Sequence, residues 1–408
     1  MRRPPRHGRR AGVRSIAVVG GSLAGLNTVR ALRAEGYDGS ITVIGEERHQ
    51  PYDRPPLSKA FLRGDLDADA LALGSPDEYA DLGARWLLGE RAVRLEPAAR
   101  AVTLTGGREL HADAVVIATG AHPRTIAGAA GLAGVHTLRT LDDAVALRAD
   151  LRAGRPCVVV VGAGFVGAEV ASTARALGLD VTVVEAAEVP LERVLGRAMG
   201  LACASLHAEH GVRLLCGTGV AGLTGEDRVT GVRLTDGRLL PADVVVVGVG
   251  VRPATDWLAG SGVAVDDGVV CDAGCATNIA GVVAVGDVAR CPNPFTGRSG
   301  RIEHWSNATE QPRTAARTLL SGRSSAAPAQ PPYFWSDQYR TRIQLAGHVG
   351  PDDQPRVVEG DLDSRSFVVV YRRHGHDVAV LAVNRPKLFG RLRRTLTPIP
   401  VTVAPVAS

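Results

Sequence analysis

Two segments of this chain combine an aliphatic strand, a glycine-rich turn and a helix in the same order, and this duplication most constrains the fold. The first places a strand at residues 15–20, a helix at 24–35 and a second strand at 41–44. The second repeats the order at residues 157–162, 165–177 and 181–184. Near-continuous apolar strands alternating with helices favour parallel sheets covered on both faces. The sequence therefore predicts an α/β chain with two Rossmann-like, dinucleotide-binding domains.

The first turn departs at one position from the G-x-G-x-x-G pattern of such domains. Gly20 permits a tight turn, Gly25 permits close contact between helix and strand, and the N–H groups that begin the helix face a pyrophosphate. Ser22 replaces the second glycine and adds a hydroxyl donor, so the site is altered but not lost. Glu46 follows the second strand, where a carboxylate accepts both hydroxyls of a ribose. We expect the turn residues to bind a dinucleotide: Gly20, Ser22, Leu23, Ala24 and Gly25.

The second turn keeps all three glycines, Gly162, Gly164 and Gly167. Glu185 lies 23 residues after the first of them, near the spacing of a ribose-binding acid. A carboxylate there favours the free 2′-hydroxyl of NADH and repels the 2′-phosphate of NADPH, although Arg193 nearby keeps NADPH as an alternative. An exposed charge at the end of a strand is the other interpretation of Glu185. The predicted NAD-binding residues of the turn are Gly162, Gly164, Phe165, Val166 and Gly167.

Two dinucleotide folds in one chain indicate that two dinucleotides meet, and FAD with NAD(P)H is the simplest pair. Residues 115–120 (VVIATG) form an apolar strand that runs into a small-residue turn, as is needed where backbone touches a cofactor. Residues 282–287 (VVAVGD) end a strand with Gly-Asp, and Asp287 is placed to hydrogen-bond a ribityl chain. The first segment adds three candidate cofactor contacts: Ala118, Thr119 and Gly120.

A third unit follows a segment rich in Ser, Ala, Gly and Pro at residues 320–332, which is typical of a linker. Beyond it, residues 342–345, 366–371 and 378–383 resemble antiparallel strands, and a basic helix is expected near 385–396. We expect a small α+β interface domain here. The predicted organisation is a basic disordered arm (1–13), an FAD-binding domain in two parts (14–122 and 253–331), an NAD-binding domain between them (123–252) and the interface domain (332–408).

Charge and composition limit the classes of partner. Of 408 residues, 45% are hydrophobic, which is ample for buried cores, and no apolar run reaches the length of a membrane span. The net charge of +5 arises in the first 14 residues, which hold six arginines and no acid. A solvated tail explains this arm more simply than a polyanion-binding one. We therefore expect neither a nucleic-acid nor a membrane partner, and, since no apolar signal segment precedes residue 15, a cytoplasmic protein.

Cysteine and histidine spacing gives no sign of a metal site. The six cysteines form no C-x-x-C pair and no zinc-finger pattern with the histidines. Cys271 and Cys275 lie closest together, and packing is the favoured interpretation, with a redox dithiol as the alternative. Lys59 and Lys387 are the only lysines in an arginine-dominated chain, which draws attention to both.

Family-specific motifs accompany the glycine turns. The most specific are PYDRPPLSK (51–59) and YFWSDQY (333–339), supported by LRTLDDA (138–144), GVGVRP (248–253), EHWSNATEQ (303–311) and FVVVYRR (367–373). On these motifs the chain resembles FAD-dependent ferredoxin reductases of the putidaredoxin-reductase and rubredoxin-reductase type, from about residue 15 to 396. The resemblance implies hydride transfer from NADH to FAD, followed by single-electron transfer to a [2Fe–2S]-type ferredoxin. That ferredoxin would serve a cytochrome P450 or a ring-hydroxylating dioxygenase.

The resemblance also implies roles for individual residues. Lys59 would stabilise the anionic character of reduced flavin, and Glu169 would face the nicotinamide and pair with Lys59. Trp305 would lie beside the isoalloxazine, and Trp335 would approach it from the side where the partner docks. Gly250 would contact NAD. The remaining implied FAD contacts are Glu46, Arg54, Val93, Arg139 and Asp287.

The way electrons leave the flavin follows from an absence of cysteine. Relatives that act on disulfides need a cysteine pair or one redox cysteine after the first helix unit, and residues 48–62 contain none, which disfavours a disulfide reductase or a cysteine-sulfenate peroxidase. An external carrier is therefore expected. Because ferredoxins are generally acidic, a basic docking face is expected, with Arg313, Arg372 and Arg373 as candidates. The alternatives are a redox-sensing flavoprotein resembling apoptosis-inducing factor, although its large insertions are not seen, and an NADH oxidase.

Overall fold

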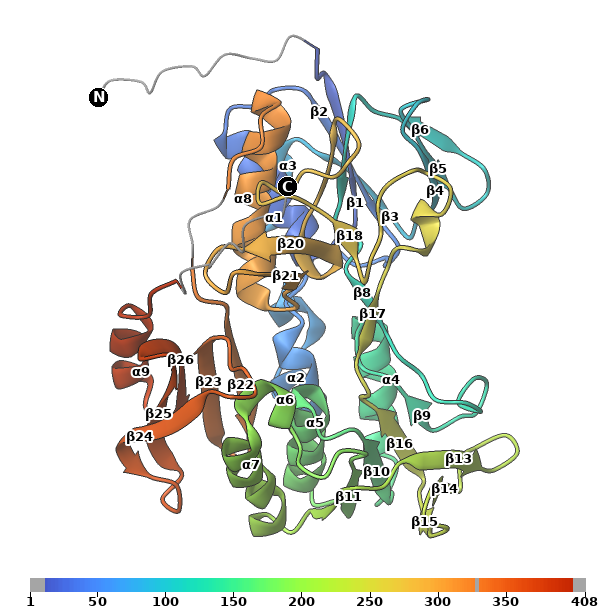
Figure 1. Cartoon of the computed structure of the whole chain (residues 1–408). Coiled ribbons are helices and arrows are strands. Elements are labelled where there is room, and N and C mark those ends of the chain that lie inside the picture. Colours follow the sequence, from blue (N-terminus) through green and yellow to red (C-terminus); the bar gives the residue numbers. More distant parts are fainter. Residues whose placement is uncertain (1–11, 327–329, 399–408) are drawn as a thin grey trace.

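The computed structural model describes residues 12–326 and 330–398 and contains two parallel sheets and one antiparallel sheet, each with five strands (Figure 1). Residues 1–11 of the predicted arm and 399–408 lie outside the described residues. The predicted fold class, two Rossmann-like domains with a small C-terminal α+β domain, is confirmed. No helix in the described part of the chain combines the length and hydropathy needed to cross a bilayer.

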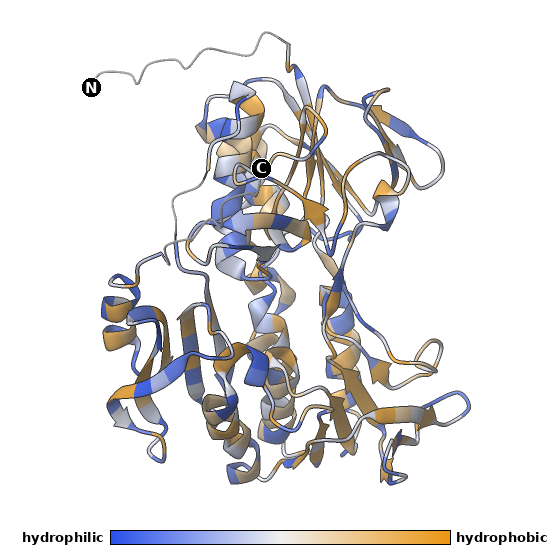
Figure 2. Cartoon of the chain, viewed as in Figure 1, coloured by the Kyte–Doolittle hydropathy of each residue, from blue (hydrophilic) through white to orange (hydrophobic). Residues whose placement is uncertain are grey.

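The first parallel sheet has the order β19-β7-β1-β2-β3 and joins segments far apart in the sequence. Its central strand β1 (Ser15–Val19) has alternating faces: Ile16 and Val18 pack into one core, Ala17 and Val19 into another. Figure 2 shows these strands as hydrophobic ribbons; helices cover one face of the sheet, and smaller β-sheets pack on the other. The neighbouring elements are β2 (Ser40–Gly45), β3 (Arg85–Leu88), β7 (Ala114–Ile117), β19 (Val282–Ala284), α1 (Leu23–Ala34) and α8 (Trp305–Ser321).

The second parallel sheet has the order β12-β11-β10-β16-β9. Its central strand β10 (Val158–Val161) consists only of buried valines, as expected for a strand covered on both faces. The other members are β9 (Val135–His136), β11 (Val181–Val184), β12 (Arg213–Leu215) and β16 (Val244–Val247), with α4 (Leu141–Leu151), α5 (Phe165–Ala176) and α7 (Arg197–Glu209) packed around them.

The chain passes between the two parallel-sheet units twice. β8 (Ala121–Pro123) and β17 (Val251–Pro253) pair antiparallel, so the chain enters and leaves the second sheet along one ribbon (Figure 1). The boundaries predicted at 122/123 and 252/253 fall within this ribbon. A smaller sheet, β18 (Val269–Val270), β20 (Ala289–Asn293) and β21 (Arg298–Arg301), lies beside α8.

The C-terminal unit is an antiparallel sheet with the order β22-β23-β26-β25-β24 and one helix, α9 (Pro386–Arg393). The strands predicted at 342–345, 366–371 and 378–383 are present as β23 (Thr341–Gly347), β25 (Ser366–Arg373) and β26 (His376–Val383). β22 (Tyr333–Gln338) and β24 (Gln354–Asp361) are further strands that the sequence pattern did not indicate.

Candidate functional site

A groove at the carboxyl ends of the first parallel sheet forms a cavity of about 430 Å³. Parallel α/β sheets bind their ligands at this end of the strands. Gly20 has φ +126°, and a Cβ there would lie 2.0 Å from the Ala118 carbonyl oxygen, so only glycine is tolerated. A Cβ on Gly25 would approach the Gly20 carbonyl oxygen to 1.9 Å, which explains the close contact between helix and strand. The cavity walls include the predicted FAD contacts Gly20, Ser22, Glu46, Arg54, Ala118, Thr119 and Arg139.

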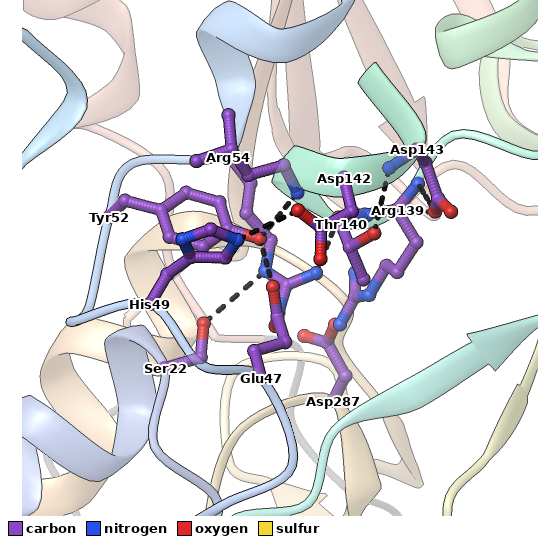
Figure 3. Close-up of polar contacts among 11 residues, drawn as sticks. Ser22, Glu47, His49, Tyr52, Arg54, Arg139, Thr140, Asp142, Asp143 and Asp287 are labelled. Carbon is purple, nitrogen blue, oxygen red and sulfur yellow. Dashed lines mark hydrogen bonds and ion pairs between the residues drawn. The ribbon is translucent and has the colours of Figure 1, made fainter. Parts of the chain in front are cut away.

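A polar network holds two arginines in this groove (Figure 3). Arg54 donates to Glu47 at 2.6 Å and to the Ser22 hydroxyl at 3.3 Å. Burial, and then the nearby Arg139, lower the pKa of Arg54. Arg139 in turn binds Asp287, with 2.9 Å between Nη2 and Oδ2. Arg54 also donates to the Arg139 carbonyl oxygen at 2.5 Å, so the predicted residues Ser22, Arg54, Arg139 and Asp287 are joined in one network. Glu47 is a member that the sequence reasoning missed.

The position of Arg139 follows from the start of α4. Thr140 caps this helix through its hydroxyl, and the Asp143 carboxylate accepts the N–H groups of Thr140 and Arg139, both at 2.9 Å. This capping box fixes the backbone that carries Arg139. The LRTLDDA motif thus has two roles: it caps α4, and it places Arg139 in the groove.

Two predicted FAD contacts differ in their exposure. Val93 on β4 (Ala92–Glu96) is 45% exposed, and its neighbour Ala92 lines the groove instead. Glu46 lines the groove and lies 3.5 Å from Arg91. The geometry thus brings Glu46 to the groove and leaves the Val93 side chain toward solvent.

The second glycine turn has the same backbone geometry as the first, and the N-terminus of its helix has more free space around it. Gly162 has φ +100°, and a Cβ on Gly167 would lie 2.1 Å from the Gly162 carbonyl oxygen. A Cβ on Gly164 would meet nothing within 4 Å, so the N-terminus of α5 is accessible to a pyrophosphate. Gly250 has φ +97°. Val166, at the start of the helix, is 46% exposed, an open position for an apolar side chain that a bound nucleotide would cover.

Glu185 is anchored beside this second turn. Its carboxylate accepts the Ala163 N–H at 2.8 Å and the Ala187 N–H at 2.9 Å, one on each oxygen. The acid therefore stands at the strand end next to the glycine turn, where the sequence placed a ribose-binding group.

One buried carboxylate connects all three units. Glu169, on α5, is 5% exposed and accepts Lys59 Nζ at 2.6 Å and the Ser58 hydroxyl at 2.5 Å on the same oxygen. Its other oxygen accepts the Ser336 hydroxyl, from β22 of the C-terminal unit, at 2.7 Å. The ion pair between Lys59 and Glu169 that the resemblance implies is thus present. Ser336 was missed, although it lies in the YFWSDQY motif.

The backbone around Lys59 explains its orientation. Two prolines begin the short 3-10 helix Pro55–Ser58, and the helix α2 (Ala60–Arg63) follows directly, so Lys59 lies at the bend between them. Its ammonium also donates to the Pro55 carbonyl oxygen at 2.9 Å. These bonds fix the cation beside the start of α5.

Aromatic side chains cluster where α8 begins. The Trp305 and Trp335 rings lie 6.2 Å apart, and Trp305 Nε1 donates to Asp53 at 2.8 Å. Burial raises the pKa of Asp53. Phe334 lies 4.5 Å from Phe165 of the second glycine turn, between ring centroids. The resemblance-based positions Trp305 and Trp335 thus contact each other, and Phe165, predicted from the second glycine turn, packs against β22 through Phe334.

The predicted docking arginines are dispersed and paired. Arg373 binds the buried Asp353 with two bonds of 2.6 and 2.7 Å, and Arg372 binds Asp377 at 2.8 Å. Arg313 lies 3.6 Å from Glu35. Next to the tryptophans are two other arginines: Arg342 lies over the Trp335 ring, 5.9 Å from its centroid, and Arg393 lies 4.6 Å from the Tyr333 centroid.

The groove fits a flavin dinucleotide on the chemistry of its residues. His304, at the N-terminus of α8 and near Asp287, has a buried Nδ1 without a hydrogen-bond partner, and burial lowers the pKa of this histidine to about 4. A neutral imidazole with an unsatisfied ring nitrogen requires a ligand group or water beside it. Together with the first glycine turn, which lines the groove, and the exposed indole of Trp305, this leaves a consistent place for FAD.

Comparison with known proteins defines the class. Residues 14–312 match the family model of the pyridine nucleotide-disulphide oxidoreductases, and residues 333–401 match the model named reductase C-terminal. The chain therefore belongs to the pyridine nucleotide-disulphide oxidoreductase family.

Its similarity to individual members is more specific. It is 41% identical to the ferredoxin reductase component of chlorobenzene dioxygenase from a Cupriavidus species, over 93% of this chain and 91% of that one. It is 36% identical to putidaredoxin reductase of Pseudomonas putida, over 94% and 92% of the two chains. The crystal structure of the covalent putidaredoxin reductase–putidaredoxin complex superposes with a TM-score of 0.89 at 35% identity, covering 94% of each chain. Within the family, the chain is a ferredoxin reductase of the putidaredoxin-reductase type, as the sequence motifs predicted.

Proposed function

We propose that this protein is an FAD-dependent NADH:ferredoxin oxidoreductase. The observation that carries this function is the Lys59–Glu169 pair, buried where the two dinucleotide-binding units and the C-terminal unit meet. FAD, when bound, accepts a hydride from NADH and releases electrons singly to a ferredoxin, which serves a cytochrome P450 or a ring-hydroxylating dioxygenase.

Different residues bind the two cofactors and support the transfer of the hydride. We assign Glu46, Arg54, Arg139 and Asp287 to FAD binding, and the second glycine turn with Glu185 to NADH. Lys59 holds a positive charge at the flavin site where negative charge develops, and Glu169 holds the ammonium in place. Because residues 48–62 contain no cysteine, no thiol relay lies in this segment, and the acceptor is a separate protein.

We propose that the acceptor docks over the tryptophans of β22 and α8. Trp335 and Trp305 connect the C-terminal sheet to the flavin side of the groove, and Arg342 and Arg393 supply positive charge at their edge. An acidic ferredoxin would be attracted to such a surface. All six cysteines are free, which suits a reducing compartment, and we place the reaction in the cytoplasm.

The test is reduction of a ferredoxin by NADH under anaerobic conditions. Purified protein loaded with FAD should bleach on addition of NADH, and a [2Fe–2S] ferredoxin from the same organism should then be reduced, as followed by its visible absorbance. Ferricyanide serves as an acceptor that needs no docking. Bleaching without reduction of any ferredoxin in a panel, but with fast oxygen consumption, would identify an NADH oxidase instead. Colourless protein that takes up no FAD would contradict the proposal entirely.

A further inference from the structure

Three of the six cysteines meet in the FAD-binding part of the molecule: Cys271, Cys275 and Cys291. β18 and β20 pair in parallel up to Val270 and Arg290, and the Cys271 N–H donates to the Arg290 carbonyl oxygen at 2.9 Å. Cys271 and Cys291 are therefore neighbours at the next position of the two strands. Cys291 also packs against both hydrophobic cores, the one that contains Cys271 and the one that contains Cys275. We name these residues the thiol cluster.

The members of the thiol cluster differ in accessibility and charge. Cys271 and Cys275 are 7% and 2% exposed, and Cys291 as a whole residue is more exposed than either. Gln311 Nε2 donates to Cys291 Sγ at 3.1 Å. The neighbouring Cys271 and Cys275 thiols also lower the pKa of Cys291. One thiolate with two adjacent thiols is the arrangement from which a disulfide forms.

The thiol cluster is joined to the predicted FAD contact Asp287 through one side chain. Gln311 donates to Cys291 with its amide nitrogen, and its amide oxygen accepts the Gly286 N–H at 2.8 Å. Gly286 directly precedes Asp287. A change at Cys291 therefore alters the support of the loop that carries the acid.

We propose that the thiol cluster is a modification site for hydroperoxides, at which Cys291 forms a disulfide with Cys271 or Cys275, and that this oxidation loosens FAD. The Cys291 thiolate attacks one peroxide oxygen, the O–O bond breaks, and hydroxide or alkoxide leaves, giving a sulfenic acid. The neighbouring thiol then attacks the sulfenic sulfur, and water leaves as the S–S bond forms. Two sulfurs lose one electron each, and the peroxide gains both. The effect on FAD rests on the proposed function.

The first experiment counts and maps thiols in the FAD-loaded protein. After one equivalent of hydrogen peroxide, titration in denaturant should find two of the six cysteines consumed, and peptide mapping should find Cys291 linked to Cys271 or Cys275. Cys157→Ser, which removes an exposed thiol, should leave this result unchanged. Cys291→Ser should lower the rate of disulfide formation at least roughly tenfold. Oxidation confined to Cys157 or Cys216 would overturn the proposal.

The second experiment measures release of FAD by its fluorescence in the filtrate. Oxidised protein should lose FAD roughly fivefold faster, because the bond from Gln311 to Cys291 that positions the acceptor of the Gly286 N–H is disturbed, and dithiothreitol should restore retention. Serine at position 291 keeps an acceptor for Gln311, so Cys291→Ser should retain FAD in peroxide. A mapped disulfide with unchanged FAD release would overturn the coupling. Thiol mapping needs no ferredoxin, so its result is independent of whether the protein reduces one.

Discussion

At the scale of single residues, Lys59 is held by more hydrogen-bond partners than an exposed surface lysine requires. Its ammonium is held by Glu169, the Pro55 carbonyl oxygen and the Ser58 hydroxyl, and its side chain is only 17% exposed. Lys59→Met keeps the length of the side chain and removes the charge. We expect this variant to bind FAD and to be reduced by NADH about 10²–10³-fold more slowly, because one fixed stabilising charge is lost. Stopped-flow bleaching of the flavin measures the rate.

Lys387→Met is the matched control, since it changes the only other lysine, which is exposed on α9. It should bleach at the rate of the unchanged protein. Equal rates for Lys59→Met and the unchanged protein would remove Lys59 from the reaction.

Glu185 allows a test of nucleotide choice at a single atom. Glu185→Gln keeps an oxygen for one of the two backbone N–H groups that the carboxylate binds, and it removes the negative charge. Discrimination against the 2′-phosphate should fall, so the ratio of kcat/KM for NADH to that for NADPH should decrease about tenfold. Steady-state reduction of ferricyanide with each nucleotide gives this ratio. If the unchanged protein uses both nucleotides equally, Glu185 does not set the preference.

Residue identities were predictable where backbone geometry requires them and less so elsewhere. The glycine turns could be found from spacing, because positive φ and close backbone contact leave little choice at Gly20 or Gly162. Glu47 could not, because two adjacent acids look alike in sequence and only the folded groove shows which one binds Arg54. Ser336 has no spacing pattern at all, since its partner is 167 residues away.

At the scale of elements, β22 connects the C-terminal unit to the reaction centre. Its Ser336 is fully buried and donates to Glu169, and its Phe334 contacts Phe165. Ser336→Ala leaves one carboxylate oxygen of Glu169 without this donor, so the position of the Lys59 ammonium becomes less fixed. We expect NADH-dependent flavin reduction to slow about tenfold, less than in Lys59→Met, as measured by stopped flow.

Ser306→Ala is the matched control, because it removes another serine hydroxyl that hydrogen-bonds to β22. The Ser306 hydroxyl donates to the Tyr333 carbonyl oxygen at 2.9 Å, at the other end of β22, and does not bind Glu169. This variant should reduce its flavin at the normal rate. A similar loss in both variants would mean that β22 packing, and not the bond to Glu169, controls the rate.

The C-terminal sheet also shows which strands could be predicted from the sequence and which could not. The strands β25 and β26 have apolar runs that are buried, and the sequence indicated them. β24 is an edge strand, exposed along its whole length and containing Pro355, so it lacks a hydrophobic alternation. β22 mixes aromatic and polar residues because it contacts other units on both sides. Strands defined by tertiary contacts in this way give no local signal.

At the scale of the whole molecule, the arrangement of the three units places the tryptophans at the junction and leaves the basic groups of the C-terminal sheet in different positions. Arg342 lies over Trp335, whereas Arg372 pairs with Asp377 near the turn between β25 and β26. The two arginines are otherwise well matched: their side chains are 49% and 50% exposed, and each has an aspartate neighbour. Substituting each of them in turn therefore distinguishes between the two proposed docking surfaces.

If ferredoxin docks over the tryptophans, Arg342→Glu should raise the KM for ferredoxin about tenfold, and Arg372→Glu should change it little. The increase should shrink at high salt, because screening removes the attraction in both proteins. Ferricyanide reduction should be unaffected in either variant. Arg373 is unsuitable for this comparison, since a glutamate there would face the buried Asp353 and destabilise the fold. An increase for Arg372→Glu alone would instead place the partner at Arg372, one of the docking candidates that the sequence first indicated.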